Sequence, residues 1–267
     1  MRSYRSSSGG RGRRFESSRP DQAGSDRYAG QFVTLRRLKA LDFRALASDR
    51  KLIVIFVVVA CILFIVGKLA SEVLEGEAFA IDQRIMLALR LPGNLGQPIG
   101  PAWLLPTMRD ITAIGGVTGL TLITLLAAGG LIAARNLKTA LFMLLAVSVG
   151  ATLASLLKTL FLRPRPTIVP HLVEVSYTSF PSGHAMNSAI VFLTLATLIA
   201  RTQPLRAVRI YIQAAAIALS VAVGASRVYL GVHWPSDVVA GWCVGGLWAV
   251  LCSVIFHGVI ANDRPDR

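Results

Sequence analysis

The chain has 267 residues, of which 54% are hydrophobic and only 16% are charged. Ordinary soluble domains carry about 25% charged residues, so this composition argues against a soluble enzyme and excludes a disordered chain or a disulfide scaffold. The formal net charge is +14, and residues 1–51 hold 13 of the 28 basic residues. A basic end on an otherwise apolar chain is typical of a membrane protein with a cytosolic tail, and it argues against a nucleic-acid-binding protein.

Residues 1–50 are predicted to form a basic, largely disordered cytosolic tail. Residues 1–30 are rich in Arg, Ser and Gly and cannot bury a core. In residues 31–50, Leu and Phe recur between basic side chains. Two interpretations of this stretch stay open, a basic amphipathic helix on the anionic inner leaflet and a solvated linker. Residues 51–262 are expected to form the membrane domain.

Apolar runs predict an all-α, polytopic bundle of six transmembrane helices, since a span needs about 20 residues. The runs cover residues 52–70, 111–134, 139–157, 185–200, 210–225 and 238–260. The fourth and fifth reach spanning length only with their polar flanks. The first starts too late and is too long for a signal-peptide core, and we interpret it as a retained anchor. Residues 79–89 predict either a short interfacial helix or ordinary loop packing.

Lys and Arg in the short loops predict the orientation of these spans. The N-terminal tail, the loops at 135–138 and 201–209 and the segment after residue 260 carry basic residues. Six spans place all four on one side, so both termini are expected in the cytosol. The cations Lys158, Arg163, Arg165 and Arg227 then fall on the outer side, against this rule. Charged groups at the ends of spans are costly and tend to be functional, so this exception is where chemistry is expected.

Three segments contain these cations or lie beside them. They are Lys158 to Pro166 (KTLFLRPRP), Pro181 to His184 (PSGH) and Ser226 to Asp237 (SRVYLGVHWPSD). The gap between the second and third holds two spans and a cytosolic loop, so all three should return to the same outer surface. Each alone has an ordinary structural interpretation: a snorkelling lysine, a stiff helix exit, a helix N-cap or a His–Asp pair at a helix start.

Together the three segments hold the groups that bind and cleave a phosphate ester. Arginine forks and a helix N-terminus bind phosphate oxygens, and two histidines can act as nucleophile and general acid. The three cysteines, Cys61, Cys243 and Cys252, lie in apolar runs without a metal-binding spacing, and the sequence has no dense carboxylate cluster. Neither a metal ion nor another cofactor is therefore expected.

The three segments resemble the three-part motif of the type 2 phosphatidic acid phosphatase family, which includes bacterial lipid phosphatases and is related to vanadium haloperoxidases. The motif parts K-x6-RP, PSGH and SR-x5-H-x3-D begin at Lys158, Pro181 and Ser226, and every motif position matches. The motifs cover residues 158–237, and the six-span layout extends the similarity to roughly residues 52–260. Any one part would be a weak indication, whereas the three parts in this order are specific.

The resemblance implies a role for each motif residue. His233 would be the nucleophile that forms a phosphohistidine, Asp237 would orient it, and His184 would protonate the leaving group and then activate water. The phosphate would be bound by Lys158, Arg165, Ser182, Gly183 and Arg227. Arg163 is not a motif position, and it is expected only as an auxiliary contact with lipid head groups.

The implied activity is a metal-independent phosphatase acting on a lipid phosphate or diphosphate at the non-cytosolic face. The expected location is a bacterial inner membrane with the site facing the periplasm, and the expected partners are the lipid substrate and the bilayer. Three alternatives stay open: phosphoryl transfer to another lipid or sugar, a vanadate-dependent haloperoxidase, and a non-enzymatic scaffold or transporter. The sequence does not indicate which lipid is used or the oligomeric state.

Overall fold

The computed structural model describes residues 59, 66–71, 80–175 and 178–259. The chain divides into two compact units, residues 1–57 and 58–267. The first unit contains the predicted basic tail and lies outside the described residues. The predicted first span, at 52–70, also lies mostly outside them. The remaining predicted spans can be compared with the structure.

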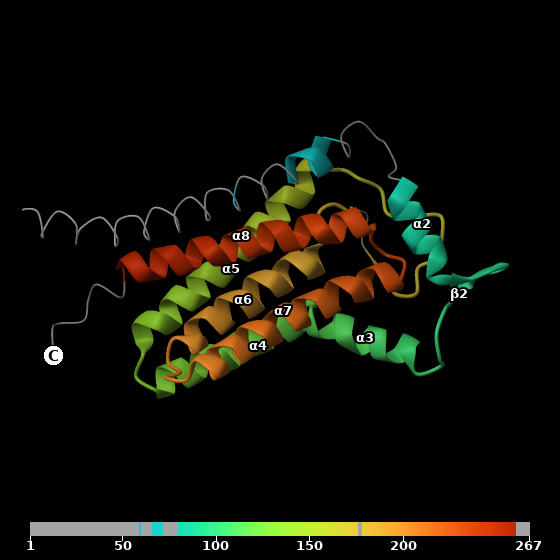
Figure 1. The fold of residues 1–267 in the computed structure, drawn as a ribbon. Helices are drawn as coiled ribbons and strands as arrows, with labels where there is room; N and C mark the ends of the chain where they lie inside the picture. The colour runs from blue at the N-terminus through green and yellow to red at the C-terminus, as the bar shows by residue number, and fades with distance from the viewer. Residues whose placement is uncertain (1–58, 60–65, 72–79, 176–177, 260–267) are drawn as a thin grey trace, which may run out of the picture. The chain divides into compact units, whose positions relative to one another are not determined.

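Long helices dominate the described part of the chain (Figure 1). Four of them are long and apolar enough to cross a membrane, and a bent helix pair gives a fifth candidate. The prediction of a mostly helical membrane protein is confirmed to that extent. The bounds of the pair and of the four helices are α3 Leu104–Ile114, α4 Val117–Ala133, α5 Leu137–Leu160, α6 Gly183–Ala200, α7 Arg206–Tyr229 and α8 Pro235–Val259.

The predicted run at 111–134 is not one straight helix. It falls on α3 and α4, whose axes differ by 53° across a short break at Gly115 and Gly116. A Cβ atom at Gly115 would lie 2.2 Å from Val223 Cγ1 of α7, so only glycine allows the bend to approach that helix so closely. Hydropathy alone predicts a continuous span here, because the glycines at the break are themselves compatible with an apolar run.

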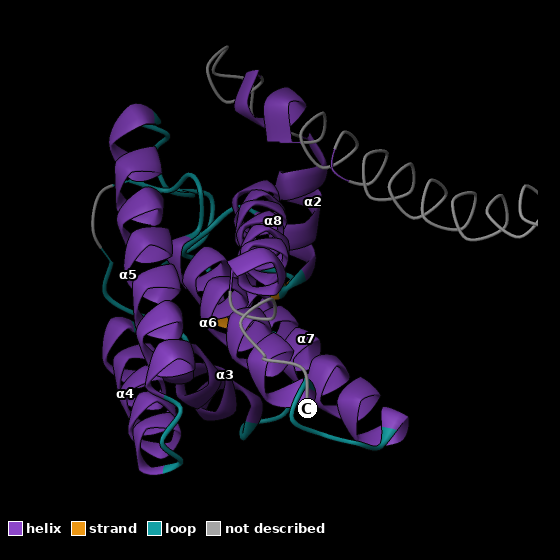
Figure 2. Ribbon diagram, turned by 90° about the vertical axis from the view of Figure 1, so that its left-hand side faces the viewer, coloured by secondary structure: helices purple, strands orange, loops and turns teal. Residues whose placement is uncertain are grey.

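The helix α6 lies at the centre of the bundle. In an 18-residue window, 61% of its residues are buried, against 22–33% for α5, α7 and α8. Figure 2 shows α6 between these three helices. Close packing with α8 depends on Gly241 and Gly245, since a Cβ atom there would lie 2.8 Å from the carbonyl oxygen of Ser182, the N-cap of α6, or 2.6 Å from that of Met186 in α6. This spacing of small residues is a common device for packing transmembrane helices.

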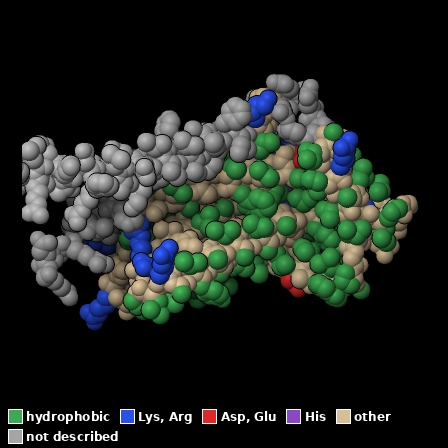
Figure 3. Space-filling model, in the orientation of Figure 1, with side chains coloured by type: hydrophobic (Ala, Val, Ile, Leu, Met, Phe, Trp, Pro, Cys, Tyr) green, Lys and Arg blue, Asp and Glu red, His purple; other side chains and the backbone are tan. Residues whose placement is uncertain are grey.

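Hydrophobic side chains cover much of the face of the described bundle that Figure 3 shows. Leucines on the flanks of α4 and α5 are more than half exposed, among them Leu126 at 68% and Leu145 at 64%. So many exposed large apolar side chains would be unfavourable in water, and they suit the hydrocarbon core of a bilayer.

A small helix and a hairpin precede the bundle. The helix α2, Ala80–Ala88, confirms the helical interpretation of residues 79–89. It buries Asp82 and Met86, which lie one turn apart on the same face, and exposes Ile81 on another. The strands β1, Arg90–Leu91, and β2, Asn94–Pro98, then form an antiparallel hairpin that the sequence analysis did not predict.

The chain direction brings four helix ends together. The last turns of α5 and α7 and the first turns of α6 and α8 lie at the same end of the bundle, on the right in Figure 1. The backbone N–H of Ser182, before α6, donates to the carbonyl oxygen of Asp237 in α8 at 3.0 Å. The three motif segments therefore meet, as the sequence predicted.

Candidate active site

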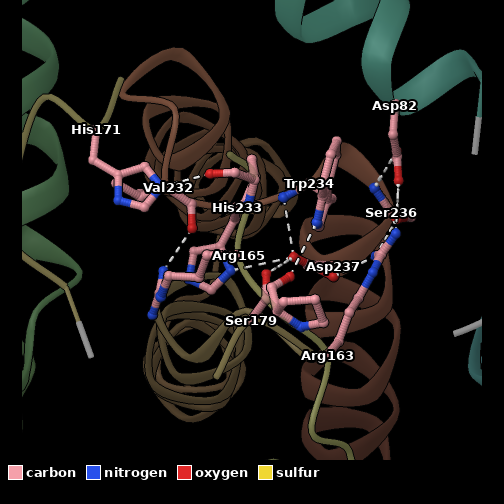
Figure 4. Close-up of polar contacts among 12 residues, drawn as sticks. Asp82, Arg163, Arg165, His171, Ser179, Val232, His233, Trp234, Ser236 and Asp237 are labelled. Carbon is pink, nitrogen blue, oxygen red and sulfur yellow. Dashed lines mark hydrogen bonds and ion pairs between the residues drawn. The ribbon is translucent and has the colours of Figure 1, made fainter. Parts of the chain in front are cut away.

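His233 lies in the turn between α7 and α8 and is almost fully buried, with 1% of its surface exposed. Its Nε2 is 3.3 Å from Nη1 of Arg165, which also donates to the carbonyl oxygen of Val232 (Figure 4). A guanidinium can only donate hydrogen bonds, so this contact favours the tautomer with the lone pair on Nε2. The lone pair then faces the cation that the sequence assigns to phosphate binding.

The other imidazole nitrogen of His233 faces Asp237. Nδ1 lies 3.5 Å from Oδ2 of Asp237, which is an ion-pair distance and longer than a good hydrogen bond. Burial lowers the pKa of His233 to about 4, although Asp237 opposes this shift. The imidazole is therefore neutral at neutral pH, which is the protonation state that a nucleophile requires.

Asp237 is held by four groups around its carboxylate. Its Oδ1 accepts from Nη1 of Arg163 at 2.6 Å. Its Oδ2 accepts from the Trp234 backbone N–H at 3.0 Å and from the hydroxyl of Ser179, and it faces His233. The contact with Trp234 closes the first turn of α8 in the manner of a capping box. The carboxylate is thus fixed in orientation before any substrate binds.

The N-terminus of α6 adds a site suited to an anion. Ser182 is the N-cap, but its buried Oγ makes no hydrogen bond in the structure. A Cβ atom at Gly183 would lie 3.0 Å from Nζ of Lys158, so glycine leaves room for this ammonium group beside the helix start. Free backbone N–H groups, a hydroxyl without a partner and an ammonium group are together suited to binding phosphate oxygens.

Arg227 enters the site from the last turn of α7 and is 4% exposed. Its Nη1 donates to Oγ1 of Thr112 in α3 at 2.9 Å, while its Nε is buried without a hydrogen-bond partner. The charges of Lys158, Arg165 and Arg227 are close enough to repel one another. Three neighbouring cations and a buried donor without an acceptor are unfavourable unless an anion binds beside them.

His184 lies in the first turn of α6 and is partly buried. A Cβ atom at Gly116 would lie 3.7 Å from its Nε2, so the bend between α3 and α4 passes beside this imidazole. His184 is close enough to His233, Lys158 and Arg227 to interact with them electrostatically. All eight residues that the sequence assigned to the site, including both histidines, therefore occupy the same end of the bundle.

Sequence reasoning missed the partners of Arg163. This side chain is 8% exposed and bonds to Asp237 and to Asp82 of α2. The expectation that Arg163 contacts lipid head groups is wrong, because its guanidinium is buried between two carboxylates. Asp82 belongs to no sequence motif. The only indication of its role in the sequence was that Arg163, a cation outside the motif, needed a negatively charged partner.

Other candidate ligands in the described residues do not gather into a metal site. No group of three or more His, Cys, Asp or Glu side chains there is arranged to hold a metal ion. Cys243 and Cys252 are free thiols. His171 is exposed in the loop after α5, with its Nε2 2.7 Å from the carbonyl oxygen of Pro166.

Comparisons with known proteins agree with this geometry. Residues 138–260 match the PAP2 superfamily model. The chain is 38% identical to phosphatidylglycerophosphatase B of Bacillus subtilis over 146 residues, which cover 54% of this chain and 70% of that protein. It is 31% identical to the lipid A 1-phosphatase of Rhizobium etli over 125 residues, which cover 43% of this chain and 50% of that protein.

A solved structure shares the fold. The crystal structure of a transmembrane PAP2-type phosphatidylglycerolphosphate phosphatase from Bacillus subtilis superposes with a TM-score of 0.67 at 30% identity. The match covers 75% of this chain and 96% of the other. The helical arrangement around the motif segments is therefore that of a known group of membrane proteins.

Proposed function

Because this chain belongs to the PAP2 superfamily, we propose that it is an integral membrane phosphatase that hydrolyses a lipid phosphate monoester or diphosphate through a phosphohistidine intermediate. The observation that carries the proposal is the position of His233 Nε2, which faces Arg165 at 3.3 Å. Two further polar atoms at this end of the bundle, Ser182 Oγ and Arg227 Nε, are buried without partners. A bound phosphate would supply acceptors to both.

In the first step, the lone pair on His233 Nε2 attacks phosphorus. A nitrogen–phosphorus bond forms while the phosphorus–oxygen bond to the lipid breaks, and the proton of His184 moves to the leaving oxygen. The positive charge that develops on His233 is stabilised by Asp237 through Nδ1. Cationic side chains offset the charge on the phosphoryl oxygens, which is the main requirement of phosphoryl transfer.

In the second step, water replaces the lipid. His184, now neutral, accepts a proton from water as the water oxygen attacks phosphorus. The nitrogen–phosphorus bond breaks, its electron pair returns to His233 Nε2, and inorganic phosphate leaves. We propose that this chemistry needs no metal ion, because the cations and the α6 N-terminus supply the positive charge.

The proposal includes a topology. The described part of the chain holds four candidate spans, or five if the bent pair of α3 and α4 is one span. Adding the apolar run at 52–70 gives the predicted six, with both termini in the cytosol. Charge asymmetry in the loops supports a site at the non-cytosolic face, which in a bacterial inner membrane is the periplasmic face. A site at helix ends lets a phosphate head group react while its lipid tail stays in the bilayer.

Phosphate release from a panel of lipid phosphates tests this function. The purified full-length chain is assayed with phosphatidic acid, phosphatidylglycerol phosphate, a lipid A phosphate and a prenyl diphosphate. The 38% identity to a phosphatidylglycerophosphatase makes phosphatidylglycerol phosphate the first candidate. We expect release from at least one lipid and none from His233→Ala. Equal release by His233→Ala would contradict the proposal.

A further inference from the structure

A buried arginine links two carboxylates behind the proposed nucleophile (Figure 4). Nη1 of Arg163 donates to Oδ1 of Asp237 at 2.6 Å and to Oγ of Ser236 at 2.8 Å, while Nη2 donates to Oδ2 of Asp82 at 3.2 Å. Both carboxylates are nearly inaccessible, with 1% of Asp82 and 0% of Asp237 exposed. Buried charges persist only when they are paired, so the three charged groups form one unit.

Asp82 also caps the helix that carries Asp237. The residue before α8 is Trp234, which has no side-chain oxygen to accept the first backbone N–H groups. Asp82 supplies those oxygens from another helix: Oδ1 accepts the Ser236 backbone N–H at 3.0 Å, and Oδ2 accepts the Ser236 hydroxyl. A carboxylate is favoured at this positive helix end. Asp82 therefore fixes the turn in which Asp237 lies.

The helix α2 is itself docked firmly at this point. Met86, one turn after Asp82, is 1% exposed and belongs to the apolar cluster that contains Trp234 and Val238. The two buried residues of α2 thus contact the start of α8 through an apolar group and a carboxylate. A helix outside the motif segments thereby acts on the turn next to His233.

We infer that Asp82 and Arg163 are positioning residues for the proposed phosphatase reaction, holding Asp237 so that its second oxygen faces His233 Nδ1. The inference rests on the proposed function. Neither residue is assigned any contact with substrate, so their loss should slow the chemical step and leave substrate binding nearly unchanged. Arg163 lies only two residues before the motif arginine, and Asp82 lies more than 70 residues before the first motif.

The charges of this unit predict that two variants shift the pKa of His233 in opposite directions. The charged and titratable groups around His233 and its neighbour His184 are Lys158, Arg165, Arg227 and Asp237, with Arg163 and Asp82 behind Asp237. Asp82→Asn removes a negative charge, so the pKa of His233 should fall. Arg163→Gln removes a positive charge, so the pKa of His233 should rise. A role in folding alone would not produce opposite shifts.

Kinetics of the full-length chain with a short-chain phosphatidic acid give the first test. Asp82→Asn should lower kcat by about 10- to 100-fold with KM within about threefold of wild type, because a misplaced catalytic group costs about that much. Asp110→Asn, an exposed carboxylate on α3, is the matched control and should behave as wild type. Arg163→Lys should recover part of the activity that Arg163→Gln loses. Wild-type kcat in Asp82→Asn would overturn the inference.

Histidine NMR gives a second test that needs no activity. The chain has four histidines, so the His233 imidazole signal can be assigned by its loss in His233→Gln. We expect its titration midpoint to move down in Asp82→Asn and up in Arg163→Gln, each by about half a pH unit or more. If Asp82→Asn does not fold, Arg163→Gln and Arg163→Lys decide the question. Unchanged midpoints would refute the inference, whereas an inactive wild type with shifted midpoints would refute only the proposed phosphatase.

Discussion

The two ends of the bundle use arginine in different ways. At the motif end, Arg227 is buried, its Nε has no hydrogen-bond partner, and it lies near other cations. At the opposite end, Arg206 and Arg209 are exposed, while the guanidinium of Arg201 lies over the ring of Phe256 and donates to Ser253. Arg227 at the motif end thus has a guanidinium nitrogen without a partner, whereas Arg201 at the opposite end contacts Phe256 and Ser253.

The difference teaches that partners and burial identify a functional cation, while residue type and position near a span end do not. Exposed arginines at a membrane surface are solvated and contribute little to stability. A buried guanidinium without a full set of acceptors costs free energy in the empty protein. Under the proposed function, a bound phosphate would offset that cost.

Removing the proposed general acid, His184, should cause the largest loss of activity among the variants that follow. His184→Gln is expected to lower kcat/KM by about 100- to 10,000-fold for a lipid phosphate, the range for general acid catalysis. A substrate with a good leaving group, such as an aryl phosphate, should lose much less kcat/KM, because this parameter reports the first step and the aryl oxygen leaves without a proton. Assays of both substrates check this, with exposed His171→Gln as the control. Equal losses for both would show that His184 does not protonate the leaving group.

Arginine variants at the two ends compare them directly. Arg227→Met should reduce kcat/KM by about 100- to 1,000-fold, the loss expected when a transition-state donor is removed. Arg206→Met and Arg209→Met should stay within about twofold of wild type, because they face solvent or head groups. Steady-state kinetics of the three variants measure the contrast. Similar losses at both ends would remove the distinction between them.

The pH dependence follows from the lowered pKa of His233. The neutral imidazole is the nucleophile, so activity should be retained above its pKa of about 4 and lost as the pH falls through that value. His184 must be protonated for the first step, and the negative charge of a bound phosphate favours that state, so a second limb should appear at higher pH in the enzyme–substrate complex and make its profile bell-shaped. Profiles of kcat/KM for the lower limb and of kcat for the upper limb check both. A flat profile would contradict catalysis by two histidines.

The smallest expected effect is the rise in Tm when vanadate binds. As a phosphate mimic, vanadate should inhibit wild type and raise its Tm by a few degrees, because it binds the folded protein and not the unfolded chain. Arg227→Met should show a smaller rise in thermal scans, and Arg206→Met the full rise. EDTA should leave activity unchanged. Strong loss with EDTA would indicate that a metal ion takes part.

Much of this arrangement could be predicted from sequence because its determinants are local. The motifs predicted eight site residues, which the fold brings to one end, and apolar runs located α5 to α8 within a few residues. The bend at Gly115 could not be predicted, because it depends on packing against Val223 of another helix. Asp82 was missed for a similar reason, since its partners Arg163 and Ser236 are more than 80 residues away.

The central claim is that His233 carries the phosphoryl group during the reaction. Brief incubation of the purified chain with a lipid labelled in its phosphate, followed by rapid alkaline denaturation, traps such an intermediate, because phosphohistidine is stable to base and labile to acid. We predict acid-labile label on the wild-type chain and none on His233→Gln. With a labelled aryl phosphate, His184→Gln should carry more label than wild type, because this variant lacks the base that activates water and hydrolyses the phosphohistidine slowly. Label on His233→Gln, or phosphate release by that variant at the wild-type rate, would contradict the account.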